Sequence, residues 1–201
     1  MGRRSDARTR LLQGADRLFR DHGFAAVGVA RLCAAAKVNK GSFYHFFPSK
    51  QALLLEVLAA AWDETGMFRQ WESQVPHEAT DQIGTFLKEL FAVHYADRES
   101  TGRVRGSLVA NIGLELGAAD TAVAREVRGL LRREEAAFES VLTAALEKGE
   151  LELRNPAQTA QTLVACLHGL LMLARIRNDL SVLPAAEAGL LRLIGISRPT
   201  H

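Results

Sequence analysis

The chain has 201 residues, of which 48% are hydrophobic and 24% are charged, the composition of an ordinary soluble globular protein. No apolar run approaches the roughly 20 residues that a membrane-spanning helix needs, because the nearest candidate, 163–174, is short and contains His168. The basic N-terminus leads into no apolar signal-peptide core, and two cysteines are too few for a disulfide framework. These features argue against secretion and membrane insertion, and we expect a cytoplasmic protein.

Basic side chains are concentrated at the N-terminus. Residues 1–50 contain ten basic and three acidic side chains and so carry a net charge of +7, whereas the whole chain carries only +2. The other residues therefore have a net charge of −5. A basic N-terminal segment on an acidic body predicts a module that binds a polyanion; the alternative is a solvated basic face.

Apolar residues recur at helical spacing along the whole chain, and alternating strand patterns are nearly absent. Four of the five prolines fall at the edges of the expected helices, which is where proline is tolerated. The pattern therefore predicts an all-α protein with about nine helices. In chain order, these helices are expected at 11–19 with a stop at Gly23, 29–36, 40–47, 49–71 with Ser49 as its cap, 83–94, 107–116, 123–146, 156–178 and 184–194.

Residues 29–47 contain two short helices separated by a tight turn at 37–39, the spacing of a helix-turn-helix motif. At about 100° per residue, the second helix has separate apolar and polar faces. Such a helix can anchor itself by one face and present hydrogen-bond donors to a major groove. The alternative is a surface helix that is polar on one side. The apolar face comprises Phe43, Phe46 and Phe47, and the polar face comprises Lys40, Gly41, Tyr44 and His45.

The stretch from Leu11 to Leu54, and above all residues 38–50 (VNKGSFYHFFPSK), resembles the DNA-binding domain of the TetR family of bacterial transcriptional repressors. The resemblance implies a homodimer in which each subunit has a three-helix DNA-binding head and a larger helical ligand-binding and dimerisation domain. We place the head at residues 1–50 and the second domain at 51–201. Two-fold symmetry then implies a palindromic operator in double-stranded DNA.

The resemblance also assigns the residues that contact DNA. Tyr44 and His45 resemble the pair that holds phosphates, Lys50 at the start of the next helix does the same, and Asn39 is expected to cap the recognition helix. Arg8 and the arginines before it are expected to form a flexible arm or a disordered tail. The full set of expected DNA-binding residues is Arg31, Lys37, Asn39, Lys40, Gly41, Ser42, Tyr44, His45 and Lys50.

Three positions depart from the family pattern. Lys37 occupies a turn position that is usually glycine, where a left-handed backbone would cost a lysine roughly 1 kcal/mol. Gly28 replaces the usual Ser or Thr, which keeps the cap geometry and loses a hydroxyl contact. Val27 replaces the usual threonine. These changes affect DNA contacts and leave the expected fold unchanged.

The body offers large side chains and a few polar groups that could line an effector pocket, although plain core packing is the favoured explanation for each aromatic residue. The helix at 156–178 is too apolar for a surface position, and with the last helix it is expected to form the dimer interface. The pocket candidates are Trp62, Phe86, Phe91, His94, Asn111, Glu115, Phe138 and His168. The interface candidates are Leu163, Leu167, Leu170, Leu171, Ala174, Leu190 and Leu193.

Three classes of function follow from these features. The first is a repressor released from its operator by a small, mainly apolar effector. The second is a DNA-binding protein of the same fold that has no small-molecule effector and is controlled by a protein partner. The third, a helical enzyme, lacks support because the sequence has no metal-ligand spacing, nucleophile elbow or glycine-rich phosphate loop. We expect no enzyme activity, no metal and no cofactor.

Overall fold

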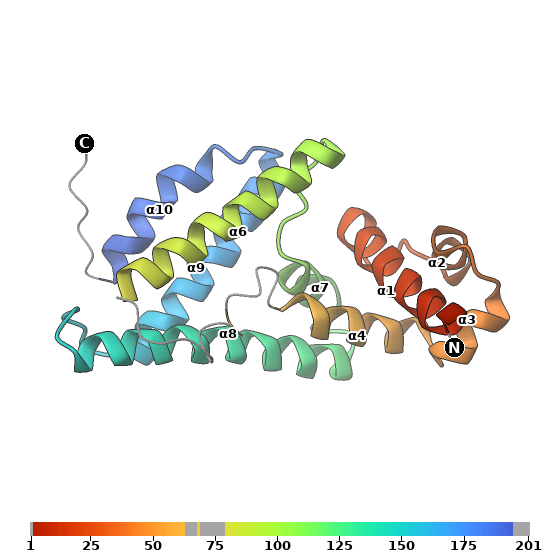
Figure 1. Ribbon diagram of the computed structural model, residues 1–201, viewed down its shortest axis with the longest axis horizontal. Helices are drawn as coiled ribbons and strands as arrows, with labels where there is room; N and C mark the ends of the chain where they lie inside the picture. Colours follow the sequence, from red (N-terminus) through yellow and green to blue (C-terminus); the bar gives the residue numbers. More distant parts are fainter. Residues whose placement is uncertain (1, 63–67, 69–78, 195–201) are drawn as a thin grey trace. The chain divides into compact units, whose positions relative to one another are not determined.

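A computed structural model describes residues 2–62, 68 and 79–194 (Figure 1). Nine helices lie within this described part and no strand does, so the all-α expectation is confirmed. The chain divides into two compact units, and each is described by itself. The first unit comprises Met1–Trp62 and Leu108–Gly129, and the second comprises Asp63–Ser107 and Leu130–His201.

The first unit contains the four N-terminal helices together with a later helix, α7, that packs against α1 and α4. Its core consists of fully buried side chains such as Leu11, Phe19, Phe43 and Leu54. The helices of this unit are α1 (Gly2–His22), α2 (Val29–Ala36), α3 (Lys40–Phe46), α4 (Lys50–Ala61), α7 (Leu108–Leu116) and the first nine residues of α8 (Thr121–Glu147).

Local hydrogen bonds at the helix ends explain why these elements begin where they do. The Asn39 side chain accepts a hydrogen bond from Ser42 N at 2.7 Å, and the Ser49 hydroxyl accepts one from Ala52 N at 3.0 Å. Both residues therefore cap the helices that the sequence predicted they would cap. Gly23 ends α1 with a φ of +77°, a backbone conformation that glycine adopts without steric cost.

Two expectations about the ends of these helices are wrong. The basic N-terminus is helical from Gly2 onward, so Arg8 lies within α1 rather than in a flexible arm, and it forms an ion pair with Glu56. The helix that begins at Lys50 ends at Ala61 instead of continuing to Trp71, a residue outside the described part. The first glycine or proline after Ala61 is Gly66, so no strong stop signal in the sequence marks the end at Ala61.

The second unit contains three long helices and the C-terminal part of α8. Asn155 caps α9 by accepting a hydrogen bond from Gln158 N at 3.0 Å, with Pro156 at the first helical position as expected. Asn178 ends α9 in the left-handed conformation, with a φ of 51°. The other helices are α6 (Ala79–Thr101) and α10 (Val182–Leu193), and α10 packs against both α6 and α9 (Figure 1).

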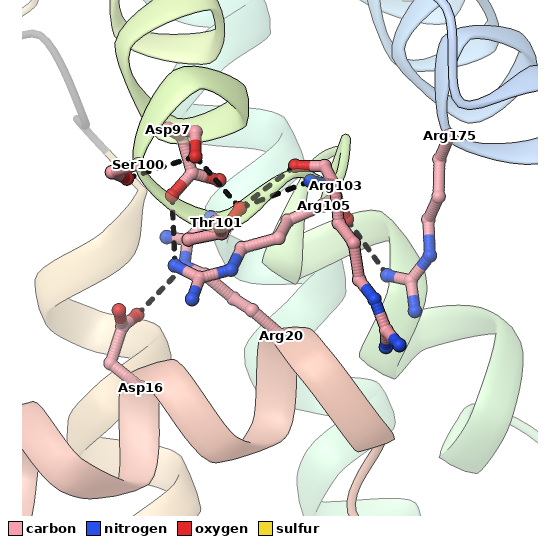
Figure 2. A network of polar contacts seen from close by, with 8 residues as sticks. All are labelled: Asp16, Arg20, Asp97, Ser100, Thr101, Arg103, Arg105 and Arg175. Carbon is pink, nitrogen blue, oxygen red and sulfur yellow. Dashed lines mark hydrogen bonds and ion pairs between the residues drawn. The ribbon is translucent and has the colours of Figure 1, made fainter.

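The connection from α6 to α7 is held within the second unit by arginine and asparagine side chains. Arg105 donates to the Asp97 carboxylate at 2.8 Å, and Arg175 donates to the Arg105 carbonyl oxygen at 2.8 Å (Figure 2). Asn178 accepts a hydrogen bond from Val104 N at 2.8 Å. The end of α9 therefore fixes the backbone of residues 104–105, only a few residues before α7 begins.

Helix α9 is long and apolar enough, by length and composition alone, to cross a bilayer. The sequence predicts no such helix when only the uninterrupted apolar run, 163–174, is counted. A helix that packs in the interior of a soluble protein has the same composition, and α9 buries Leu163, Leu167 and Leu171 within the chain.

Candidate functional site

The recognition helix α3 has the two faces that its sequence predicted. Phe43 and Phe47 are fully buried, and Phe46 is half-buried. The polar side of the helix is exposed, and the Tyr44 side chain has 55% of its surface accessible. Three aromatic rings thus anchor a short helix whose other face is open to a ligand. The exposed residues on that face are Lys40, Gly41, Tyr44 and His45, with Ser42 half-buried.

The turn before α3 has the left-handed backbone conformation considered for Lys37 in the sequence. Lys37 has a φ of 53° and a ψ of 49°, the left-handed region that disfavours a side chain with a Cβ atom. Its side chain is exposed beside the recognition helix. The preceding helix α2 is packed through Leu32 and Cys33, and burial raises the pKa of the Cys33 thiol, with the Lys40 charge opposing. Cys33 is therefore a buried apolar side chain rather than a reactive thiolate.

Arg31 and Lys50, two of the expected DNA contacts, interact with other groups of the first unit. Arg31 Nη2 lies 2.7 Å from His22 Nε2, and both side chains are exposed. Lys50 Nζ donates to the carbonyl oxygens of Phe24 at 2.8 Å and Val27 at 3.0 Å, and it lies 3.8 Å from the centroid of the Phe24 ring. Burial lowers the pKa of Lys50, and the charge of Glu115 partly opposes this shift.

Glu115, an expected pocket residue, instead binds the turn that follows α1. Its carboxylate oxygens accept hydrogen bonds from Phe24 N at 2.8 Å and from Ala25 N at 2.7 Å. The partners are about 90 positions away in the sequence, so no local pattern could have indicated this contact. Two other pocket candidates, Trp62 and Asn111, are half-buried and belong to this same unit.

The remaining pocket candidates lie in the second unit, where aromatic rings cluster. The ring centroids of Phe86 and Phe138 are 5.2 Å apart in an edge-on arrangement. The ring centroid of Phe68 lies 4.9 Å from that of Phe86 and 5.7 Å from that of Phe138. Phe91 and His94 of α6 are also buried. The structure therefore brings three phenylalanines from different segments together in one apolar cluster.

A buried polar pair joins α8 and α9 in the same unit. His168 Nε2 lies 2.7 Å from Glu134 Oε2, and only 8% of the Glu134 surface is exposed. His168 Nδ1 is buried and has no hydrogen-bond partner in the part of the chain that the structure describes. Sequence reasoning selected His168 but missed Glu134. The spacing of Glu134 could have indicated its burial, because it lies on the apolar stripe of α8, four residues from both Leu130 and Phe138.

Most of the expected dimer-interface residues are buried within the chain itself. Leu163, Leu167, Leu171, Ala174 and Leu190 are almost inaccessible, and Leu170 is half-buried. A different set of apolar side chains on the last two helices is exposed: Met172 (39%), Leu173 (39%), Ile176 (72%) and Leu193 (49%). Only Leu193 belongs to both the expected and the exposed sets.

Comparison with known families gives two matches on this chain. Residues 11–57 match the family described as "Bacterial regulatory proteins, tetR family". Residues 86–190 match "Tetracyclin repressor-like, C-terminal domain". The second match alone covers more than half of the chain, and together the two include both the helix-turn-helix and the α8–α9 pair.

Relatives that match most of this chain are named as transcriptional repressors. The HTH-type transcriptional repressor NemR of Escherichia coli K12 is 27% identical over 202 residues, covering 94% of each chain. The HTH-type transcriptional repressor DhaR of Mycobacterium sp. strain GP1 is 24% identical and covers 88% of this chain and 86% of its own. The crystal structure of reduced E. coli NemR superposes with a TM-score of 0.77, at 25% identity over 94% of this chain and 98% of NemR. A TetR-family regulator from Agrobacterium tumefaciens reaches 0.82 at 21% identity, over 95% and 98% of the two chains.

Proposed function

Since the chain belongs to the TetR family of bacterial transcriptional regulators, we propose that it is a repressor which binds a palindromic operator as a homodimer and is released by a small, mainly apolar effector. The observation that carries the DNA-binding part is the geometry of α3. This helix buries Phe43 and Phe47 and exposes a face made only of glycine and polar or charged side chains. Such a face can enter a major groove without exposing the core.

The residues on and around this face have distinct roles in the proposal. Lys40, Gly41 and Ser42 meet base edges and the backbone, and Tyr44 and His45 hold phosphates. Lys37 and Asn39 in the central turn and Arg31 on α2 contact the phosphate backbone. Arg31, Lys37 and Lys40 contribute to the positive charge of the N-terminal segment, which attracts DNA from a distance.

Pairing of two copies through α9 and α10 sets the distance between the two recognition helices. The exposed apolar side chains on these helices are Met172, Leu173, Ile176 and Leu193. Contiguous exposed apolar groups on helices of a soluble protein mark an association surface. The expected residues Leu163, Leu167, Leu171, Ala174 and Leu190 then support this surface from within the subunit, and Leu170 lies at its edge.

For the effector, we propose a site beside the aromatic cluster and the His168–Glu134 pair. The buried Nδ1 of His168 is a polar atom available to a ligand, and Phe138, which contacts the Phe86 ring, lies about one helical turn from Glu134 on α8. An apolar compound with a single hydrogen-bonding group fits this combination. Phe91 and His94 belong to the same unit, whereas Trp62, Asn111 and Glu115 belong to the other and have no part in this site.

The first experiment is a footprint of the purified protein on the DNA that flanks its own gene, at two salt concentrations. The proposal expects a protected palindrome whose half-sites are about one helical turn apart, or a similar distance. Binding that is weak, independent of sequence and abolished by salt contradicts specific operator recognition. Since DNA binding is its task, the proposed location is the cytoplasm.

The effector is then sought by release of the labelled operator. A panel of small apolar compounds, each with or without one hydrogen-bonding group, tests the site, with Glu134→Gln as the site variant and Glu139→Gln as an exposed control on the same helix. The proposal expects release by a compound that carries the polar group, and weaker release from Glu134→Gln than from Glu139→Gln. If no compound releases the operator and a protein from the same cell does, the alternative of control by a protein partner is favoured.

A further inference from the structure

The turn between α1 and α2 is held by charged side chains on two sides. Glu115 of α7 accepts hydrogen bonds from the N–H groups of Phe24 and Ala25, and Lys50 of α4 donates to the carbonyl oxygens of Phe24 and Val27. Two successive backbone N–H groups that point at one carboxylate form a concave anion site. We call residues 23–27 the clasped turn.

Gly23 makes room for this carboxylate. A Cβ atom built on Gly23 would lie 2.8 Å from Glu115 Oε2, closer than real Cβ contacts allow. Glycine at this position therefore serves two purposes, since it also adopts the positive φ that ends α1. The Phe24 ring packs 5.5 Å from Phe19 of the core, which fixes the side-chain face of the same turn.

The clasped turn leads directly into the helix-turn-helix. Gly28 follows it as the N-cap of α2 and offers no side-chain hydrogen bond to the helix. The start of α2 therefore lacks the local hydroxyl cap that would fix it independently of the turn. The fully buried Val27 and the bonds to Glu115 and Lys50 are what hold the backbone immediately before this cap.

We propose that Glu115 is a positioning residue for DNA binding, which fixes the clasped turn and through it the orientation of α2 and α3 toward the operator. This inference rests on the proposed function, because operator binding is the activity that the residue supports. It makes α7, a helix far from the motif in the sequence, a working part of the DNA-binding unit.

The negative charge of Glu115 and its hydrogen bonds to the turn predict opposite effects on DNA affinity, which makes the inference testable. Glu115 is an exposed negative charge on a unit that binds a polyanion, so its charge alone weakens DNA binding. If only charge matters, Glu115→Gln strengthens binding to every duplex. If the carboxylate positions the turn, the same substitution weakens operator binding, because an amide has one acceptor oxygen for two N–H donors.

The experiment compares Glu115→Gln and Glu115→Ala with the matched variant Glu126→Gln. Glu126 lies in the first unit, on α8, and its carboxylate has no hydrogen-bond partner among the described residues. Affinities for the footprinted operator and for a random duplex of equal length are measured at two salt concentrations. Amide hydrogen exchange at Phe24 and Ala25 is measured without DNA, and thermal unfolding shows whether each variant is folded.

We expect Glu115→Gln to lower operator affinity by about three- to tenfold, as loss of a charge-assisted hydrogen bond does, and Glu115→Ala to lower it further. Affinity for the random duplex stays equal or rises, as it does for Glu126→Gln. Exchange at Phe24 and Ala25 becomes faster in both Glu115 variants only. Equal strengthening of both duplexes by Glu115→Gln and Glu126→Gln overturns the inference, and so does unchanged amide exchange.

Lys50→Met tests the other side of the clasped turn. A lysine that contacts phosphate contributes about one unit to the slope of log affinity against log salt. We expect Lys50→Met to lower operator affinity while the slope remains as in the original protein. A slope that falls by about one unit means that Lys50 contacts a phosphate in the complex and does not hold the clasped turn. Absence of any protected operator contradicts the proposed function, whereas the amide exchange alone still shows whether Glu115 holds the turn.

Discussion

The N-termini of the recognition helix and the next helix in the first unit, and the interior of the second unit, are fixed by hydrogen bonds of different sequence distance. In the first unit, Asn39 and Ser49 cap helices through atoms only three residues away, and these helices carry the DNA-facing side chains. In the second unit, the polar contacts that define the interior join distant residues, as between Glu134 and His168 or between Val104 and Asn178. Local bonds can be inferred from spacing, whereas distant bonds depend on how the helices pack.

The largest expected effect on DNA binding comes from a substitution in the second unit that prevents dimerisation. Ile176→Glu places a charge at an apolar side chain that is 72% exposed, and two-fold symmetry brings two such charges together. We expect a folded monomer and a fall in operator affinity on the order of 100-fold, because the second half-site no longer binds as part of the same complex. Sedimentation and operator titration measure both effects.

The matched control for this change is Val93→Glu, at an apolar side chain of α6 that is 40% exposed. It adds the same charge to the same unit, on a helix outside the proposed interface. A dimer that survives Ile176→Glu, or is lost equally in Val93→Glu, shows that the exposed apolar side chains of α9 are not the interface.

Within the first unit, the fully buried and half-buried phenylalanine rings of α3 should contribute differently to the free energy of unfolding. Phe43→Ala removes a fully buried ring, and we expect the free energy of unfolding to fall by roughly 3–5 kcal/mol. Phe46→Ala removes a half-buried ring of the same helix and should cost clearly less. Denaturant unfolding of the two variants is the measurement. Equal losses would mean that α3 is not anchored by its apolar face.

The first unit was predictable in detail because its signals are short. Asn39, Ser49 and Lys37 each act on the backbone within a few positions, and the sequence indicated the role of each correctly. The residues that bind Lys50 and Glu115 were not predictable, because Phe24 is separated from them by 26 and 91 positions. The end of α4 at Ala61 was missed for the opposite reason, since the sequence there has no stop signal to detect.

In the second unit, the sequence identified apolar stripes and could not say which stripe faces the chain's own core. Helix α9 is apolar on two sides, so Leu167 and Leu173 were equally good interface residues by composition. In the folded chain the first is buried and the second is exposed. Glu134 was hidden by the same ambiguity, because one acid on a long amphipathic helix does not reveal its partner.

The His168–Glu134 pair provides a test of how costly a distant polar contact is. Glu134→Leu leaves both nitrogen atoms of a half-buried histidine unpaired, and we expect a loss of about 1–3 kcal/mol in the free energy of unfolding. The double variant Glu134→Leu, His168→Phe replaces both partners with apolar groups and should recover most of this loss. Additive losses in a double-mutant cycle would contradict a direct interaction between the two side chains.

The smallest expected effect separates backbone strain from DNA contact at one residue of the turn before α3. Lys37 has a φ of 53°, so Lys37→Gly relieves the strain of a side chain in the left-handed region, although glycine also gains freedom in the unfolded chain. We expect a net stabilisation of about 0.5 kcal/mol in the free energy of unfolding. The same change removes an exposed charge beside α3, so the salt dependence of operator binding should fall by about one unit. Lys40→Ala is the comparison, since Lys40 has an ordinary helical backbone and should lower the slope without raising stability. If Lys37→Gly raises stability and leaves the slope unchanged, this lysine is strained without contacting DNA, and the phosphate contacts of the motif are confined to α3 and its neighbours.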